Sequence, residues 1–171
     1  PGGPRICRPA SPPMSQPVTY EVTRLDNGIT IATAEMPHMA SACVGVWATV
    51  GSRFESPGQN GIAHFVEHLL FKGTPTRDSL TISREIEGLG ATVEAFTTED
   101  HTCFYTRGPS DSLDKMAEVL LDMYCRPTID PFEIEREREV ILEEIAMYLD
   151  TPSQHIEDPV SYTHLTLPTK V

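Results

Sequence analysis

One segment of the chain reads GIAHFVEHLLFKG, residues 61–73. Its apolar residues recur at helical spacing, which predicts a helix over about 62–72 that the last glycine ends. At 100° per residue, this apolar stripe lies on the side of the helix opposite His64, Glu67 and His68. We therefore expect the stripe to be buried and the three polar side chains to point toward a single site. The stripe consists of Ile62, Phe65, Val66, Leu69 and Leu70.

The two histidines have the spacing of metal ligands. Residues four apart on a helix lie one turn apart, so both imidazoles can reach one zinc ion at about 2.0–2.1 Å. A catalytic zinc site needs a third protein ligand, which must come from elsewhere in the chain. The pattern has only three fixed residues, so the alternative is a chance match in which His64, Glu67 and His68 lie on a solvated helix face.

A later helix, predicted over 131–149, offers the third ligand. Glu137 and Glu144 lie two turns apart on one side of it, whereas Glu143 points about 100° away. If this side packs on the first helix, Glu144 is the candidate ligand, and Glu137 could orient a ligand histidine. The helix is rich in charge, so a solvated face is the alternative for these glutamates.

The rest of the ordered chain predicts further strands and helices. An Asn-Gly turn at 27–28 joins the first two strands, and the segment 42–50 is apolar at nearly every position, which favours a central strand. Asp130 and Glu133 predict a capping box where the last helix begins. The order predicts an α+β domain with helices packed on one face of a mostly antiparallel sheet. The predicted strands are 18–25, 29–34, 42–50, 91–98 and 101–107, and the predicted helices are 62–72, 79–89, 112–124 and 131–149.

Composition restricts the class of protein. The chain has 171 residues, enough for one domain with its own core. Its formal net charge of −12 argues against a nucleic-acid binder, which would show a basic face. No apolar run approaches the ~20 residues that span a bilayer. The 4 cysteines form no C-x-x-C pair, which favours reduced thiols in a cytosol-like compartment.

Four segments closely resemble the pitrilysin/insulinase family of zinc peptidases, which includes the mitochondrial processing peptidases and has the inverted H-x-x-E-H order. They are GSRFE at 51–55, GIAHFVEHLLFKGT at 61–74, AFTT at 95–98 and EREREVILEEI at 135–145. The resemblance covers about 18–158. It implies the fold of one half of such a peptidase and hydrolysis of peptides or unfolded segments by a zinc-dependent endopeptidase.

The resemblance also implies a role for each site residue. His64, His68 and Glu144 would hold one Zn²⁺, and Glu144 follows His68 by 76 residues, as the third ligand does in the family. Glu67 would be the general base that takes a proton from the attacking water. Glu137 corresponds to a supporting glutamate of the family, seven residues before the third ligand.

In the family, the peptide substrate adds as a strand along a sheet edge beside the metal. That edge corresponds here to 91–98, with substrate contacts expected at Glu94, Ala95, Phe96 and Thr97. Glu94 stands where many relatives have asparagine, a difference that favours basic peptides.

The family encloses its substrate between homologous halves, so the resemblance implies a second half-domain or a partner subunit. We therefore expect little or no peptidase activity from the isolated 171 residues. We interpret 1–17, with its six prolines, as a disordered head and 18–158 as an incomplete N-terminal zinc-peptidase domain. The segment 159–171 does not continue the resemblance, and we interpret it as a foreign tail.

The motif also allows two interpretations other than a peptidase: a non-catalytic subunit and a structural zinc site. The family contains non-catalytic subunits that bind peptide or scaffold a complex, but these usually lose part of the motif, which this chain retains. A purely structural zinc would need a fourth His or Cys, and none is well placed. The sequence around Glu144 resembles bacterial members, so we expect a bacterial cytoplasmic protein, with the mitochondrial matrix as the alternative location.

Overall fold

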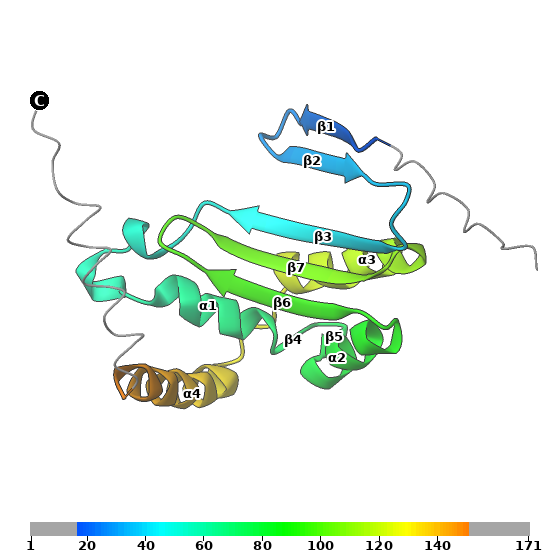
Figure 1. Cartoon of the computed structure of the whole chain (residues 1–171). Coiled ribbons are helices and arrows are strands. Elements are labelled where there is room, and N and C mark those ends of the chain that lie inside the picture. Colours follow the sequence, from blue (N-terminus) through cyan, green and yellow to red (C-terminus); the bar gives the residue numbers. More distant parts are fainter. Residues whose placement is uncertain (1–16, 151–171) are drawn as a thin grey trace, which may run out of the picture.

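The computed structural model describes residues 17–150 (Figure 1). All of the predicted head except Pro17 lies outside these residues, as do 151–158 of the predicted domain and the whole predicted tail at 159–171. No helix within 17–150 combines the length and the apolarity that crossing a bilayer requires.

The central sheet has three antiparallel strands in the order β3-β7-β6. The prediction that 42–50 forms the central strand is wrong, because β7 lies between β3 and β6. In β3 only alternate side chains are half-buried, and Trp47 on the opposite face is 63% exposed. The apolar residues of 42–50 are therefore not buried on both faces of the sheet. The strands are β3 (Ser41–Ala48), β6 (Thr92–Thr97) and β7 (Thr102–Pro109).

Two short hairpins accompany this sheet. The predicted N-terminal hairpin forms from β1 (Thr19–Arg24) and β2 (Thr30–Glu35), which pair with each other in a separate sheet. A hairpin of β4 (Gly73–Thr74) and β5 (Arg77–Asp78) joins α1 (Ile62–Leu70) to α2 (Ser79–Gly88). It was not predicted, because two-residue strands have no periodicity to detect. Every strand pair within the described residues is antiparallel.

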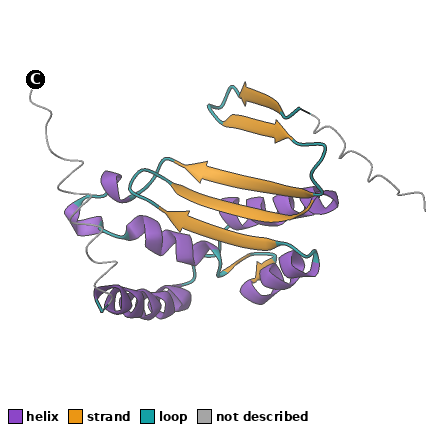
Figure 2. Cartoon of the chain, in the orientation of Figure 1, coloured by secondary structure: helices purple, strands orange, loops and turns teal. Residues whose placement is uncertain are grey.

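Helices cover one face of the three-stranded sheet, as predicted (Figure 2). Helices α2 and α3 form one part of the core with β3 and β6, and α1 packs on β6 and β7. Helix α4 packs on α1. The helices are α1 (Ile62–Leu70), α2 (Ser79–Gly88), α3 (Leu113–Cys125) and α4 (Pro131–Leu149). Short 3₁₀ turns lie at Ser52–Phe54, Pro57–Gln59 and Ser110–Ser112.

The ends of α1 and α4 show how the sequence positions these two helices. The Asp130 carboxylate caps α4 by accepting a hydrogen bond from Phe132 N at 2.8 Å. The predicted capping box is wrong in its second half, because Glu133 pairs with Arg136 instead.

At the start of α1, both oxygens of Glu55 accept backbone hydrogen bonds, from Gly61 N at 2.6 Å and Ala63 N at 2.8 Å. A remote carboxylate therefore supplies the cap that Gly61 lacks.

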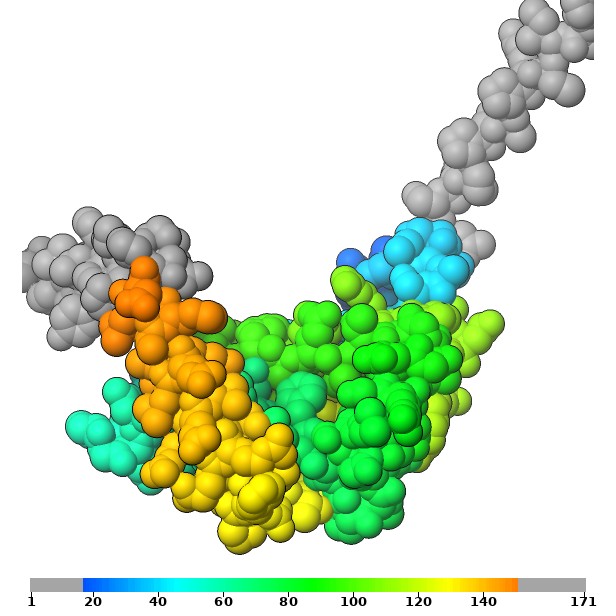
Figure 3. Space-filling view, turned by 90° about the horizontal axis from the view of Figure 1, so that it is seen from below, coloured from blue at the N-terminus to red at the C-terminus, as the bar shows by residue number. Residues whose placement is uncertain are grey.

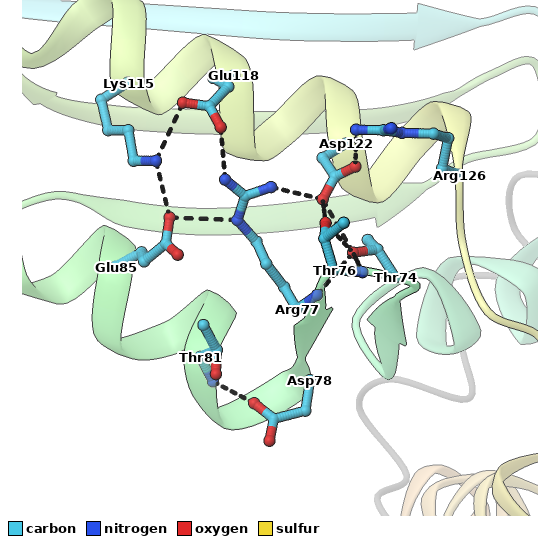
Figure 4. Close-up of polar contacts among 10 residues, drawn as sticks. All are labelled: Thr74, Thr76, Arg77, Asp78, Thr81, Glu85, Lys115, Glu118, Asp122 and Arg126. Carbon is cyan, nitrogen blue, oxygen red and sulfur yellow. Dashed lines mark hydrogen bonds and ion pairs between the residues drawn. The ribbon is translucent and has the colours of Figure 1, made fainter.

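A buried ionic network holds the connection between α1 and α2 against α3 (Figure 4). Asp122 of α3 is 4% exposed, and its Oδ2 accepts from Arg77 Nη1 at 2.6 Å. The same oxygen accepts from the hydroxyls of Thr74 at 2.9 Å and Thr76 at 3.0 Å. Arg126 Nη2 lies 2.5 Å from the other oxygen, Oδ1. The charges of this network are thus compensated where they are buried.

Candidate metal centre

Helix α1 presents three different faces to its surroundings. Its buried residues include Ala63, Glu67 and Leu70, which follow the i, i+4, i+7 pattern and face the sheet. The predicted apolar stripe is only partly buried, since Ile62 is 46% and Val66 is 38% exposed. The helix lies between the sheet and α4, and its buried side therefore includes Glu67. Glu67 is the member of the predicted polar group that packs toward the sheet.

The two histidines face α4, and their ring nitrogens converge on one of its glutamates. His64 Nε2 and His68 Nε2 are 3.2 Å apart. Glu144 Oε2 lies 3.9 Å from His64 Nε2 and 3.6 Å from His68 Nε2. All three side chains are half-buried, and their ligand atoms lie within 4.8 Å of one another. The space-filling view from below shows α4, in yellow and orange, extending beside the rest of the domain (Figure 3).

These separations fit a zinc ion. Ligand atoms about 2.0–2.1 Å from a tetrahedral ion are about 3.3 Å from each other, close to the separations in this site. Two imidazoles and one carboxylate are also the ligand types that zinc accepts when a fourth position stays open. The structure thus brings His64, His68 and Glu144 together, from helices that are far apart in the sequence.

Glu137 supports this group from the interior of the domain. It is 4% exposed, and its Oε2 lies 3.2 Å from His68 Nδ1, while its Oε1 lies 2.5 Å from Lys72 Nζ. Burial raises the pKa of Glu137, but the hydrogen bonds with Lys72 and His68 outweigh it and hold the pKa below its usual range. An ionised Glu137 favours the proton on His68 Nδ1, which leaves the Nε2 lone pair free for a metal.

Replacing Glu137 with glutamine is expected to weaken zinc binding by about 10–100-fold. The amide has one acceptor oxygen for two donors, so either His68 or Lys72 loses its partner. Glu139→Gln, an exposed change of the same type on the same helix, is the matched control. Competition titration with a chromophoric chelator measures both affinities, and equal values would contradict this role of Glu137.

Glu67 lies against β6. Glu67 is 9% exposed, and its Oε2 accepts a hydrogen bond from the Thr97 hydroxyl at 2.5 Å. This is the one hydrogen bond that the structure gives to the Glu67 carboxylate within 17–150. Glu67 is one residue before His68 and three after His64, so it lies within one turn of both histidines on α1.

The other residues expected to contact substrate follow β6, which is an edge strand of the three-stranded sheet as far as residues 17–150 show. Ala95 is half-buried and packs toward the core. Glu94 lies on the opposite face and accepts a hydrogen bond from the Tyr105 hydroxyl. Phe96 is 38% exposed on that face and contacts the rings of Trp47 and His101 edge-on.

Sequence reasoning missed three residues that position the site: Glu55, Lys72 and the hydroxyl of Thr97 as a partner of Glu67. Lys72 follows His68 by one helical turn, a spacing that could have suggested a shared partner. No local pattern marks Glu55 as a cap for a helix whose N-cap residue lies six positions later. The Thr97 contact joins residues 30 positions apart and depends on how α1 packs on the sheet.

The described part of the chain has an α+β fold in which two helices bring two histidines and a glutamate together as a possible metal site. Residues 30–168 match the family model for the insulinase peptidases, peptidase family M16. This match extends into the predicted tail at 159–171. The chain belongs to the insulinase family of peptidases.

Individual relatives agree with this assignment. An uncharacterized zinc protease of Streptomyces coelicolor is 41% identical over 145 residues, which cover 85% of this chain and 32% of the relative. The beta subunit of the mitochondrial-processing peptidase of Blastocladiella emersonii is 44% identical, over 72% of this chain and 27% of the subunit. A protease from Helicobacter pylori has a similar crystal structure, with a TM-score of 0.72, 28% identity and coverage of 77% of this chain and 32% of that one. The chain thus spans about a third of the length of the relatives it matches.

Proposed function

We propose that this domain carries the metal centre of a zinc-dependent endopeptidase, in which His64, His68 and Glu144 hold the ion. The observation that carries the proposal is the convergence of the two Nε2 atoms and Glu144 Oε2, with ligand atoms within 4.8 Å of one another. A zinc ion bound there supplies the Lewis acidity that activates water toward a peptide carbonyl.

Glu67 is the proposed general base. Its carboxylate accepts the proton of the attacking water and later passes it to the nitrogen of the leaving amine, so that the peptide C–N bond breaks without releasing a free amide anion. The hydrogen bond from Thr97 holds one carboxylate oxygen, and the other oxygen accepts the proton. Low exposure of Glu67 limits competing water around the carboxylate.

The substrate binds as an extended strand along β6, according to this proposal. The strand is an edge of the sheet within 17–150 and lies beside α1, so a paired peptide backbone would pass next to the metal ligands. Main-chain hydrogen bonds provide affinity with little demand on sequence. Glu94 on the open face favours a basic side chain in the peptide, as does the net charge of −12.

A second half-domain or a partner subunit completes the catalytic chamber in this proposal. Helix α4 exposes several large apolar side chains, which in other proteins mark surfaces that another domain covers. They include Phe132, Val140, Leu142, Ile145 and Leu149. The mitochondrial-processing peptidase relative is itself named as a subunit. The 171 residues alone are therefore proposed to cleave peptides weakly or not at all.

The bacterial relatives favour the bacterial cytoplasm as the location, with the mitochondrial matrix as the alternative.

Removal of zinc provides the test. The full-length protein is expected to cleave an unstructured basic peptide, to lose this activity on dialysis against a zinc chelator, and to recover it with about one equivalent of zinc per site. Mass spectrometry of the products would show internal cleavage. Stoichiometric zinc binding with no cleavage of any unstructured peptide would instead favour a non-catalytic, peptide-binding subunit.

A further inference from the structure

The hydroxyl of Thr97 joins the proposed base to the strand along which substrate is proposed to bind. Thr97 Oγ1 donates to Glu67 Oε2 at 2.5 Å, and Glu67 is 9% exposed. A hydrogen bond from a hydroxyl to an ionised carboxylate is short and about twice as strong as one between neutral groups. A buried carboxylate without such a donor is costly. The contact therefore restricts where the Glu67 side chain points.

A second hydroxyl is the competing acceptor for the Thr97 proton. Thr102 lies opposite Thr97 in the β6–β7 pairing, and the two Oγ1 atoms are 3.2 Å apart. Thr102 Oγ1 donates its proton to the carbonyl oxygen of Val50 at 2.9 Å. Each hydroxyl has one proton, so Thr97 can donate to either Thr102 or Glu67. The charged and nearer acceptor, Glu67, is favoured.

The backbone beside these two hydroxyls packs tightly against the segment that follows β3. Gly51 is buried, and a Cβ atom at this position would lie 2.3 Å from the carbonyl oxygen of Thr98. The same approach allows Arg53 N to donate to the carbonyl oxygen of Glu99 at 2.9 Å. The segment that follows β3 is thus fixed to the turn between β6 and β7. Thr97 and Thr102 lie at that turn and have little freedom to move away from Glu67.

We propose that Thr97 is a positioning residue for Glu67: its hydroxyl holds carboxylate oxygen Oε2 and thereby presents Oε1 to the attacking water. This inference rests on the proposed function. It differs from the substrate-contact role that the family resemblance implies for Thr97, because its side chain points to the base and only the backbone of Thr97 is left for a peptide. Loss of the hydroxyl should therefore slow the chemical step without weakening substrate binding.

The test compares Thr97→Val and Thr97→Ser in the full-length protein. We expect Thr97→Val to lower kcat by about 10–100-fold, the usual range when a side chain that orients a reactive group is lost. KM and the zinc affinity, measured by chelator competition, should stay within about twofold of the parent values. Thr97→Ser keeps the hydroxyl and should restore most of kcat.

Thr106→Val is the matched control. Thr106 is fully buried on β7, and its hydroxyl has no hydrogen-bond partner among residues 17–150. The same substitution there should leave kcat unchanged and raise the unfolding temperature of the zinc-free protein, because an unsatisfied buried hydroxyl is removed. Thr97→Val should lower that temperature, and Thr97→Ser should not.

Three results would overturn the proposal: unchanged kcat in Thr97→Val, a parallel loss of zinc affinity, or no recovery in Thr97→Ser. If Thr97→Val does not fold, Thr97→Ala removes the same hydroxyl with less bulk and is expected to show the same loss of kcat. Glu67→Gln separates the two hypotheses. Full activity in Glu67→Gln refutes the proposed function, whereas an inactive Glu67→Gln beside a fully active Thr97→Val refutes only the role of Thr97.

Discussion

Glu67→Gln is expected to lower kcat for peptide cleavage by about 10²–10⁴-fold, the contribution typical of a general base. The amide has nearly the size and shape of the carboxylate but cannot accept the proton of the attacking water. Its oxygen can still accept the Thr97 hydrogen bond, so the local packing is preserved. The zinc affinity should remain within a few fold of that of the parent, because Glu67 is not a proposed ligand.

The measurement is the rate of peptide cleavage by zinc-loaded full-length protein, with the zinc content determined on the same samples. Glu87→Gln is the control, since Glu87 is an exposed glutamate on α2. A variant that lost zinc together with activity would leave the role of the base unsupported. Equal turnover by Glu67→Gln and Glu87→Gln would show that Glu67 is not the base.

Asp122→Asn is expected to lower the free energy of unfolding by about 3–5 kcal/mol, the usual cost of removing one partner from a buried ion pair. Arg77 also faces Glu85 at 3.2 Å and Glu118 at 2.5 Å, but Asp122 is the most deeply buried of its acidic partners. The asparagine leaves the Arg77 guanidinium incompletely compensated in this network (Figure 4). Asp26→Asn, at an exposed turn, should change stability by less than about 0.5 kcal/mol.

The pH dependence of stability gives an independent check. Burial raises the pKa of Asp122, but hydrogen bonds from Arg77, Thr74 and Thr76 outweigh it and lower the pKa from 3.8 to about 2. Because the folded-state value is the lower one, this stabilisation is fully present above pH 3.8 and disappears as the pH falls toward 2. Urea unfolding at a series of acidic pH values should therefore show a shallower decline for Asp122→Asn than for the parent. Identical slopes would contradict the assignment.

This network also matters for the metal centre. It holds the β4–β5 hairpin, which begins three residues after α1 ends. The carbonyl oxygen of Gly73 in that hairpin accepts a hydrogen bond from Thr128 N at 2.8 Å, just before α4 begins. The chain segments that lead out of α1 and into α4 are thus joined. Their relative placement decides whether Glu144 reaches the two histidines.

Local patterns in the sequence were sufficient for most of the elements. The Asn-Gly turn predicts the β1–β2 hairpin, and Asp130 with Pro131 predicts the start of α4, because these residues act on backbone geometry within a few positions. The H-x-x-E-H spacing indicates a metal site for a similar reason, since one helical turn separates the histidines. The third ligand depended on the family resemblance, because helical periodicity leaves open which face of α4 meets α1.

The tertiary structure decided the strand order and the packing of the helices, which short-range sequence patterns do not specify. The sequence by itself determined that His64 and His68 lie one turn apart on a helix, since helix geometry relates near neighbours. It did not determine that β7 rather than β3 is central, or that Glu67 faces the sheet while the histidines face α4. Those outcomes depend on contacts between distant segments, such as Glu67 with Thr97 and His68 with Glu137, and strand pairing and helix packing select among several locally equivalent arrangements.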